Sequence, residues 1–326
     1  MDLDGGELGG TLSWTAPSTV TYVTEYFAYF GQDLAGAVRW RAGSAVPVGA
    51  NELGVPADTS LSSWVYGLVY TASLLSEQTT PAFSLIVDHD ASVSSIAFND
   101  LDLDADHVGG DITWSHPSDV SRVSGFDVYL AASMLGASRS RVGSGSVSAA
   151  ASTAKVGANT DRDGATYIVV YTGSSLAEQS TPFAAYLSDR KPTVADIAFV
   201  DLDLDSGEIG GEVTWSDPVD TSDLVYYAVY LSANAAGGGR SLVEDSVLLG
   251  STSAEVPVNT GMGSFSYVAV YAGSSLQEQT TPVTQSILDS TVSFPTVEFS
   301  DQDLDAGQFG GEISFSPSGD FAHVSS

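Results

Sequence analysis

The chain has 326 residues, 43% of them hydrophobic, and its 41 Asp and Glu against 10 Lys and Arg give a formal net charge of −31. This length suits two to four ordinary domains, each with its own apolar core. The negative field repels nucleic acid and anionic membranes, so we expect no nucleic-acid partner, and cations are the natural counterpart. Cysteine is absent, so disulfides contribute nothing. No apolar run approaches the roughly 18 residues of a membrane-spanning helix, and we expect no membrane insertion in this segment.

A repeat of about 100 residues organises the chain. Four aromatic residues stand in matching contexts, each after an acidic segment ending in Gly-Gly and before a proline: Trp14, Trp114, Trp215 and Phe315. The period predicts β-sandwich repeats at 1–90, 91–190 and 191–290, and a partial fourth repeat at 291–326. Met1 stands in the register of Leu101, so the first repeat should lack its opening strand. We therefore expect a segment of a longer array; the alternative is a tail that pairs with a neighbouring chain as a donated strand.

The second repeat gives the expected elements in chain order. Short alternating runs are separated by Gly, Pro, Asp and Ser, which is typical of an antiparallel sandwich. We predict strands at 93–99, 111–115, 125–131, 138–143, 153–157, 166–172 and 183–188. No helical period of useful length appears. The predicted fold is all-β, a tandem array of seven-stranded antiparallel β-sandwiches.

Three motifs recur on these strands: Leu/Ile/Val-x-Trp-x-x-Pro on the second, Tyr/Phe-x-Val-Tyr on the third, and a Tyr that opens the sixth. Together they resemble fibronectin type III domains in all three complete repeats. The resemblance implies that the repeated Trp lies in the core. It also implies tyrosine corners, whose hydroxyls bond the preceding loop, at Tyr66, Tyr167 and Tyr267. The long acidic first loop departs from that family.

A longer phrase links the chain to a narrower group. The phrase Asp-Leu-Asp-x-Gly-Glu-x-Gly-Gly-x-x-Thr-Trp, with Ser-Ser-Leu-x-Glu-Gln-Thr-Thr-Pro downstream, is similar to tandem repeats in very large surface proteins of dinoflagellate algae. This similarity supplies context and not mechanism.

The acidic segment that opens each repeat is the main candidate site. Side chains two residues apart in an extended chain share a face at about 6–7 Å. Asp100, Asp102 and Asp104 would therefore repel one another unless a cation lay among them. Calcium takes about six to eight oxygen ligands from such groups. The alternative is a solvated acidic turn that keeps a β-protein soluble and protects a sheet edge.

The spacing also approaches that of the helix-flanked calcium loop, with an acid at its twelfth position in Glu212 and Glu312. Flanking helices are missing from the prediction, so we interpret the segment as a calcium-like carboxylate loop and not as an EF-hand.

Fold topology predicts that this loop lies where one repeat meets the next. Residues 100–106 should approach Asp189 and residues 159–161, while Glu278 and Asp217 or Asp220 approach from the next repeat. A bridging Ca²⁺ would stiffen the joint. The predicted metal ligands are Asp2, Asp4, Asp100, Asp102, Asp104, Asp106, Asp111, Asp189, Asp201, Asp203, Asp205, Glu212, Glu278, Asp289, Asp301, Asp303, Asp305 and Glu312.

Two further residue types recur in register. The arginines Arg39, Arg139 and Arg240 are expected to pair with a nearby carboxylate, or else to contact an acidic neighbour in an assembly. The tyrosines Tyr29, Tyr129 and Tyr230 should point outward, where they either cover their own sheet or form a lateral contact surface for protein or glycan.

Function is predicted from the array and from what it lacks. No catalytic or phosphate-binding constellation is present in the sequence, so we expect no enzyme. The leading hypothesis is a structural segment of an extracellular filament, appendage or surface coat, stiffened by calcium, with other copies or flanking repeats as partners. The alternatives are the stalk of a calcium-dependent cell-surface adhesin and an accessory carbohydrate-binding module of a secreted enzyme.

Overall fold

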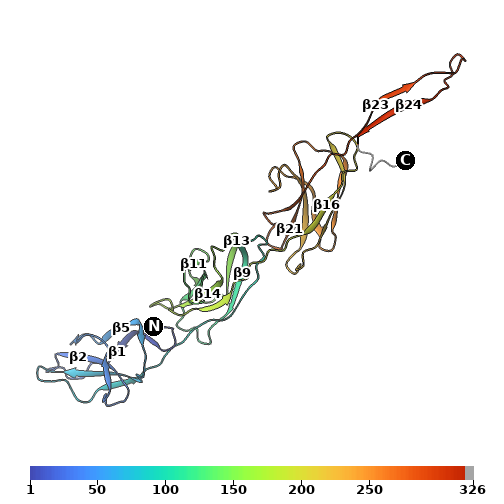
Figure 1. Cartoon of the computed structure of the whole chain (residues 1–326). Coiled ribbons are helices and arrows are strands. Elements are labelled where there is room, and N and C mark those ends of the chain that lie inside the picture. Colours follow the sequence, from blue (N-terminus) through green and yellow to red (C-terminus); the bar gives the residue numbers. More distant parts are fainter. Residues whose placement is uncertain (320–326) are drawn as a thin grey trace. The chain divides into compact units, whose positions relative to one another are not determined.

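The structure is a computed structural model that describes residues 1–319, and its regular elements within that range are all β-strands (Figure 1). Residues 320–326 of the predicted partial repeat lie outside the described range. None of the described residues belongs to a helix long and apolar enough to cross a bilayer.

Contacts divide the chain into two compact units. The first contains Met1–Asn99, Asp111–Val156 and Arg162–Ser188, and the second contains Asp100–Gly110, Gly157–Asp161 and the chain from Asp189 onward. The acidic loop of the second repeat therefore packs in one unit with the third repeat. The acidic loop of the first repeat shares a unit with the body of the second.

The first repeat has two sheets. One sheet pairs β1 with β5, and the other has the order β3-β2-β6-β7, with β4 also paired to β2. The strands are β1 Glu7–Ser13, β2 Glu25–Gly31, β3 Arg39–Arg41, β4 Val46–Pro47, β5 Glu52–Ser60, β6 Tyr66–Ala72 and β7 Ala82–Leu85.

The second repeat adds an opening strand. Its sheets have the orders β13-β9-β8 and β11-β10-β14-β15, with β12 also paired to β10. The strands are β8 Ser94–Phe98, β9 His107–Ser115, β10 Gly125–Ala131, β11 Ser140–Arg141, β12 Val147–Ser148, β13 Thr153–Asp161, β14 Tyr167–Gly173 and β15 Phe183–Tyr186. Each strand predicted for this repeat has a counterpart.

The third repeat has the same plan, with sheets β16-β17-β20 and β19-β18-β21-β22, and a two-stranded hairpin of β23 and β24 follows it. The strand pairings of this repeat and of the hairpin are antiparallel. The strands are β16 Ala195–Phe199, β17 Glu208–Ser216, β18 Tyr226–Ser232, β19 Ser241–Leu248, β20 Ser253–Gly261, β21 Tyr267–Gly273, β22 Val283–Ser286, β23 Val292–Phe299 and β24 Ile313–Gly319. Three strands packed on four is the fibronectin type III arrangement, so the predicted fold is confirmed.

The core lies between the two sheets and contains the repeated tryptophan, as predicted. Trp215 is 4% exposed, and its ring meets that of Tyr227 edge-on with the centroids 5.5 Å apart. Trp114 forms the same edge-on pair with Phe126. Trp14 is only half-buried. In the first repeat no described strand pairs with the outer edge of β1, where β8 and β16 lie in the other two, so its core is less covered.

The tyrosine corners were predicted at the wrong residue. The hydroxyl groups that bond a loop carbonyl belong to Tyr70 and Tyr171, which donate to Ala35 O at 3.2 Å and Leu135 O at 3.4 Å. Tyr66 instead packs its ring edge-on against Phe83. The two tyrosines are four residues apart and share one face of β6, so position along the strand explains the difference: Tyr66 at the strand's start is half-exposed, while Tyr70 is fully buried beside the loop that carries Ala35.

Glycine is required beneath these hydroxyls. Gly136 has φ of +77°, and a Cβ atom there would lie 2.0 Å from the Tyr171 hydroxyl. Gly36 repeats this geometry beneath Tyr70. Only a residue without a side chain fits both the backbone conformation and the space.

Candidate functional site: the joint between repeats

The acidic loop is a ladder of aspartates that bond the backbone two residues ahead. Asp100 Oδ1 accepts from the Asp102 amide and Asp102 Oδ1 from the Asp104 amide, both at 3.1 Å. Asp201 and Asp203 repeat these bonds, as do Asp301 and Asp303 in the tail. Such side-chain-to-backbone bonds hold the loop in a series of turns. Leu103, which alternates with these aspartates, belongs to the hydrophobic core cluster of the third repeat and is 1% exposed.

The first aspartate of the ladder fastens the loop to the chain that leaves the last strand. Asp100 accepts from the amides of Gly109 at 3.0 Å and Arg190 at 2.9 Å. Asp201 does the same with Gly210 and Ser290. The aspartate is therefore used within its own repeat.

The second aspartate fixes a turn with a left-handed residue at its tip. Asp102 Oδ2 accepts from the amide of Asn159, whose φ is +55°, at 2.5 Å. Asp203 bonds Asn259 in the same way at 2.7 Å, and Asp2 bonds Asp58 at 2.7 Å. Asn and Asp tolerate this conformation better than other side chains.

The third aspartate reaches into the following repeat. Asp4 accepts from the amides of Ser180 at 2.7 Å and Thr181 at 3.0 Å, with both donors in the Glu-Gln-Ser-Thr-Pro segment of the second repeat. Asp104 accepts from Thr280 and Thr281 at the same distances. Both carboxylates are buried, at 4% and 3% exposure. Two amide donors to one charged acceptor form a strong clamp.

We call the segments that meet these aspartates, residues 174–182 and 274–282, and their counterpart in the first repeat, residues 73–81, the docking turns. Each docked turn adds the same further contacts. Gln179 Nε2 donates to Leu3 O at 2.7 Å, and Gln279 Nε2 donates to Leu103 O at 2.6 Å. The turn also donates a serine hydroxyl to a loop carbonyl, from Ser174 to Met1 O at 2.5 Å and from Ser274 to Leu101 O at 2.6 Å.

A leucine of each docking turn sits over the Gly-Gly pair that ends the acidic loop. Leu176 approaches Gly9 and Leu276 approaches Gly109 so closely that a Cβ atom on either glycine would lie 2.8 or 2.7 Å from the leucine Cδ2. The Gly-Gly pair therefore admits the apolar side chain of the next repeat.

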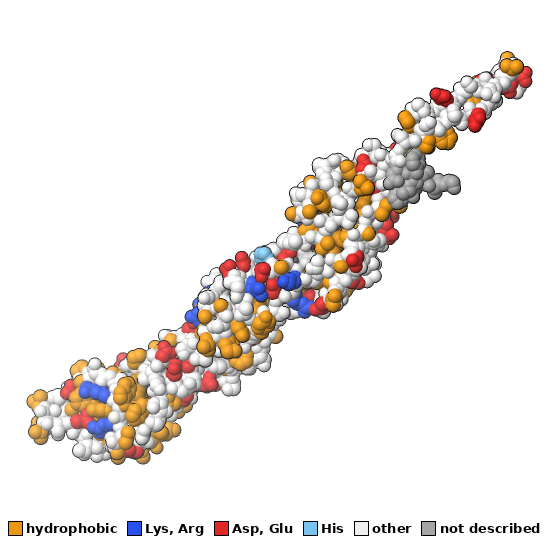
Figure 2. All heavy atoms as spheres, viewed as in Figure 1, with side chains coloured by type: hydrophobic (Ala, Val, Ile, Leu, Met, Phe, Trp, Pro, Cys, Tyr) orange, Lys and Arg blue, Asp and Glu red, His pale blue; other side chains and the backbone are white. Residues whose placement is uncertain are grey.

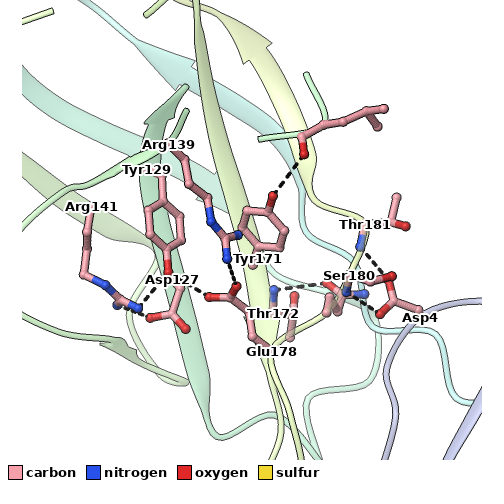
Figure 3. Close-up of polar contacts among 12 residues, drawn as sticks. Asp4, Asp127, Tyr129, Arg139, Arg141, Tyr171, Thr172, Glu178, Ser180 and Thr181 are labelled. Carbon is pink, nitrogen blue, oxygen red and sulfur yellow. Dashed lines mark hydrogen bonds and ion pairs between the residues drawn. The ribbon is translucent and has the colours of Figure 1, made fainter. Parts of the chain in front are cut away.

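A network of charge and aromatic rings holds each docking turn in place. Glu178 accepts from Arg139 at 2.7 Å and from the Tyr129 hydroxyl at 2.9 Å. The Arg139 guanidinium lies over the Tyr129 and Tyr171 rings, 4.4 and 4.2 Å from their centroids. Figure 3 shows this network beside Ser180, Thr181 and Asp4. The same triad recurs as Arg39 with Glu77 and Arg240 with Glu278.

These contacts decide the roles of the recurring arginines and tyrosines. Each arginine forms the predicted ion pair within its own repeat. Each outward tyrosine covers its own sheet and donates its hydroxyl to the glutamate of the docking turn. Burial, followed by the bond to Glu278, raises the pKa of Tyr230 to about 12.

Glu278 is a correction to the predicted ligand set. We expected it to face the acidic loop, but Arg240 at 2.8 Å and Tyr230 at 2.9 Å hold its carboxylate within its own repeat. The neighbouring Gln279 side chain and the Thr280 amide face the loop instead. Adjacent residues of an extended segment point to opposite sides, which the motif alone could not orient.

The other predicted ligands lie at several different positions in the fold. Asp189 and Asp289 accept from the amides of Asp106 at 3.0 Å and Gly207 at 2.9 Å. The side chain of Asp106 is exposed. Asp111 and Glu212 lie at exposed positions of strands β9 and β17, and Glu312 is exposed directly before β24. The acidic loop is therefore not closed by the acid expected at its twelfth position. The tail aspartates Asp301 and Asp305 are exposed, and Asp303 is partly buried.

The structure gathers carboxylates in two groups that the sequence prediction only partly contained. Their ligand atoms lie within 4.8 Å of one another, and the groups are Asp2, Asp4, Glu7 and Asp58, and Asp203, Asp205 and Glu208. Sequence reasoning missed Glu7, Asp58 and Glu208. Glu7 and Glu208 occupy the same position of the repeat, so a recurring glutamate was visible in the sequence. His107 occupies that position in the second repeat and interrupts the recurrence.

Burial and amide donors shift the pKa values of the buried aspartates at this site in opposite directions. Burial raises the pKa of Asp100 to about 6 although three amides bond its charged form. Burial also raises the pKa of Asp4, against the Ser180 and Thr181 amides that lower it. The pKa of Glu7 is raised by burial and by the charges of Asp4, Asp2 and Asp58. This first group would be stabilised by a cation.

Arg190 adds an ion pair at the start of the third repeat. Its guanidinium pairs with Asp223 at 2.7 Å and also with Asp220. Asp220 therefore pairs with the arginine of the linker, whereas Asp217 accepts from the Tyr227 hydroxyl at 2.7 Å within the third repeat.

Comparison with protein-family models and with curated proteins gives no match. Among the solved structures similar to the chain are two tandem arrays. They are the chicken CNTN1 FN1–FN3 domains (16% identity, 87% of this chain and 95% of that chain covered, TM-score 0.27) and the central fibronectin-III array of RIM-binding protein (13% identity, 89% and 99% covered, TM-score 0.24). The chain's own strand order defines it as a tandem fibronectin type III-like array. Its similarity to algal surface repeats stays a prediction.

Proposed function

We propose that this chain is a structural repeat segment whose acidic loops clamp each β-sandwich to the next, in an extracellular filament, appendage or surface coat. The observation that supports the proposal most directly is the recurrence of one contact set in two joints. In each, a buried aspartate, a glutamine, a serine and a leucine make equivalent contacts. A joint built from backbone amides of one docking turn restricts bending between neighbouring repeats.

We also propose that calcium binds the two carboxylate groups, Asp2 with Asp4, Glu7 and Asp58, and Asp203 with Asp205 and Glu208. Calcium prefers several carboxylate oxygens at one point. The raised pKa of Glu7 has mutual repulsion among its causes, and a divalent cation would relieve it. Among the described residues, the remaining predicted ligands do not gather into a group of three or more carboxylates, so they have no part in this proposal.

Extracellular location remains part of the proposal because the net charge of −31 suits water rich in screening cations. An adhesin stalk would need the same rigid joints. The distinction between coat, filament and stalk is a question of what the array carries at its ends, and electron microscopy of native material separates them.

Calcium titration of the full chain tests the metal proposal. Calcium should raise the thermal unfolding midpoint, and chelator should reverse the gain, because an ion that binds only the folded state stabilises it by mass action. Glu208→Gln, which removes one ligand charge from the second group, should reduce the calcium affinity of that group, while Glu212→Gln on the exposed strand serves as the matched control. Identical melting with calcium and with chelator would exclude calcium at these sites and leave the clamp itself untouched.

A further inference from the structure

The two joints share one clamp but differ at three positions beside it. The first joint is the contact of the first acidic loop with the second repeat, and the second joint is the contact of the second acidic loop with the third repeat. The three positions carry Glu7, Asp58 and Ala177 in the first joint and His107, Asn159 and Gln277 in the second. The joints therefore differ in charge and in hydrogen-bond donors, although their aspartate clamps match.

An amide pair, formed by the side chains of Asn159 and Gln277, links the two repeats of the second joint. Asn159 Nδ2 donates to Gln277 Oε1, and Gln277 Nε2 donates to Asn159 Oδ1, both at 3.1 Å. Gln277 Nε2 also donates to the buried Asp102 carboxylate, at 3.1 Å from Oδ2. The charge of Asp102 thus receives a donor from the next repeat, in addition to the Asn159 amide. This joint satisfies its second aspartate without an ion.

A basic side chain lies beside the clamp of the second joint as well. One cavity there is lined by Asp104, His107 and Lys191. The positions of His107 and Lys191 carry Glu7 and Asp90 in the first joint. The second joint therefore has a resident positive charge where the first has carboxylates, so a metal ion gains less attraction there.

The first joint has neither the amide pair nor a basic side chain at these positions. Ala177 offers no side-chain donor in place of Gln277. The first carboxylate group instead brings four ligand atoms within 4.8 Å of one another. Glu7 Oε2 is enclosed and has no hydrogen-bond partner among the described residues. A buried carboxylate oxygen without a donor is costly, and a calcium ion among these groups would satisfy it.

Two members of the first carboxylate group also contact the docking turn of the second repeat. Asp4 accepts from the amides of Ser180 and Thr181, and the Ser180 hydroxyl hydrogen-bonds the Glu7 carboxylate. Repulsion among the four carboxylates opposes this arrangement because it favours their separation. An ion bound among them removes the repulsion and holds Asp4 where the docking turn meets it. Ion binding and closure of the first joint therefore stabilise each other.

We propose that calcium controls the closure of the first joint, while the amide pair keeps the second joint closed without metal. The inference rests on the proposed calcium site of the first carboxylate group and adds that the two joints respond differently. Three positions of the repeat, those of Glu7, Asp58 and Ala177, then determine which kind of joint forms. One array can therefore contain joints that loosen when calcium is scarce beside joints that do not.

Amide hydrogen exchange of the full chain compares both joints in one molecule. The Ser180 and Thr181 amides report opening of the first joint, and the Thr280 and Thr281 amides report opening of the second. Calcium should slow exchange in the first joint at least about tenfold relative to chelator, and an ion at about 100 times its dissociation constant that binds only the closed joint slows it about 100-fold. Exchange in the second joint should be the same in calcium and in chelator.

Single substitutions separate the two mechanisms. Glu7→Gln should reduce the calcium effect in the first joint, and Glu52→Gln, at an exposed strand position of the same repeat, is the matched control. Gln277→Ala should accelerate exchange in the second joint about tenfold, with or without calcium, because Asp102 loses a donor to its charge.

A triple variant gives the second joint the residues of the first. His107→Glu combined with Asn159→Asp and Gln277→Ala should make exchange in the second joint slower in calcium than in chelator, as it is in the first. The Val270 amide in β21 reports whether the sandwich of the third repeat stays folded. If the triple variant does not fold, the two single substitutions still decide the inference.

The outcomes separate this inference from the proposed calcium sites. Equal calcium responses in the two joints would overturn the inference and leave calcium binding in place. Equal exchange of the first joint in calcium and in chelator would also overturn it, and a calcium-dependent unfolding midpoint in the same sample would show that the ion binds without controlling the joint. Exchange that Gln277→Ala leaves unchanged would remove the amide pair from the second joint's closure.

Discussion

The clamp makes one prediction that can be worked out from its geometry. Asp104→Asn keeps the shape of the side chain but leaves one oxygen to accept two amides, those of Thr280 and Thr281. The new NH₂ group faces the second amide as a donor. A hydrogen bond to a charged group contributes about 1.5–3 kcal/mol, and an unsatisfied buried donor costs about 1–3 kcal/mol. We take about 2 kcal/mol as the loss for this joint.

Amide hydrogen exchange measures that loss directly. The Thr280 and Thr281 amides exchange when the joint opens, which is a local event that leaves the sandwich folded. Since about 1.4 kcal/mol corresponds to a factor of ten, their exchange should accelerate by roughly 30-fold. The Val270 amide in the buried strand β21 should keep its rate. Asp205→Asn is the control, because the same substitution at an exposed aspartate removes no amide bond of this joint.

Unchanged exchange at Thr280 and Thr281 in Asp104→Asn would refute the reasoning, since the aspartate would then contribute nothing to closing the joint. Faster exchange at Val270 as well would show that the variant destabilises the whole repeat, and the clamp would not be a separable element.

Two further substitutions test the energetics of the fold. Asp100 has a pKa of about 6 in the folded protein against 3.8 for the ordinary group, so the folded state binds the proton first. The unfolding free energy of the unmodified chain relative to Asp100→Asn should therefore increase as pH falls from about 6 towards 4, measured by denaturant titration; a difference independent of pH would contradict this. Gly136→Ala should destabilise the chain more than Gly143→Ala. Both glycines have φ of +77°, but only a Cβ at Gly136 meets the Tyr171 hydroxyl, at 2.0 Å. The backbone strain alone costs about 1–2 kcal/mol, so equal unfolding free energies for the two variants would remove the steric argument.

Surface charge accords with the composition. Figure 2 shows acidic side chains spread over the visible face, while basic ones gather in a few small groups. Several of the basic side chains form ion pairs, as Arg139 does with Glu178 and Arg190 with Asp223. The described chain thus keeps its negative charge available to cations.

The sequence by itself determined the period, the all-β class and the strand positions. These follow from local rules, because alternation and turn residues are read within a few neighbours, and the repeated Trp marks the same core position each time. It also singled out the acidic loop as the candidate site, since three aspartates at alternate positions are costly without partners.

Only the tertiary structure decided what those aspartates bond. The partners of Asp104 are backbone amides 176 and 177 residues away, and backbone amides have no signature in a sequence. The choice of Tyr171 over Tyr167 depended on how far along β14 the loop that carries Leu135 lies, and the orientation of Glu278 depended on which side of the extended chain the residue faces. A shift of one position reverses that face, so the fold had to place the strands before the joint could be recognised.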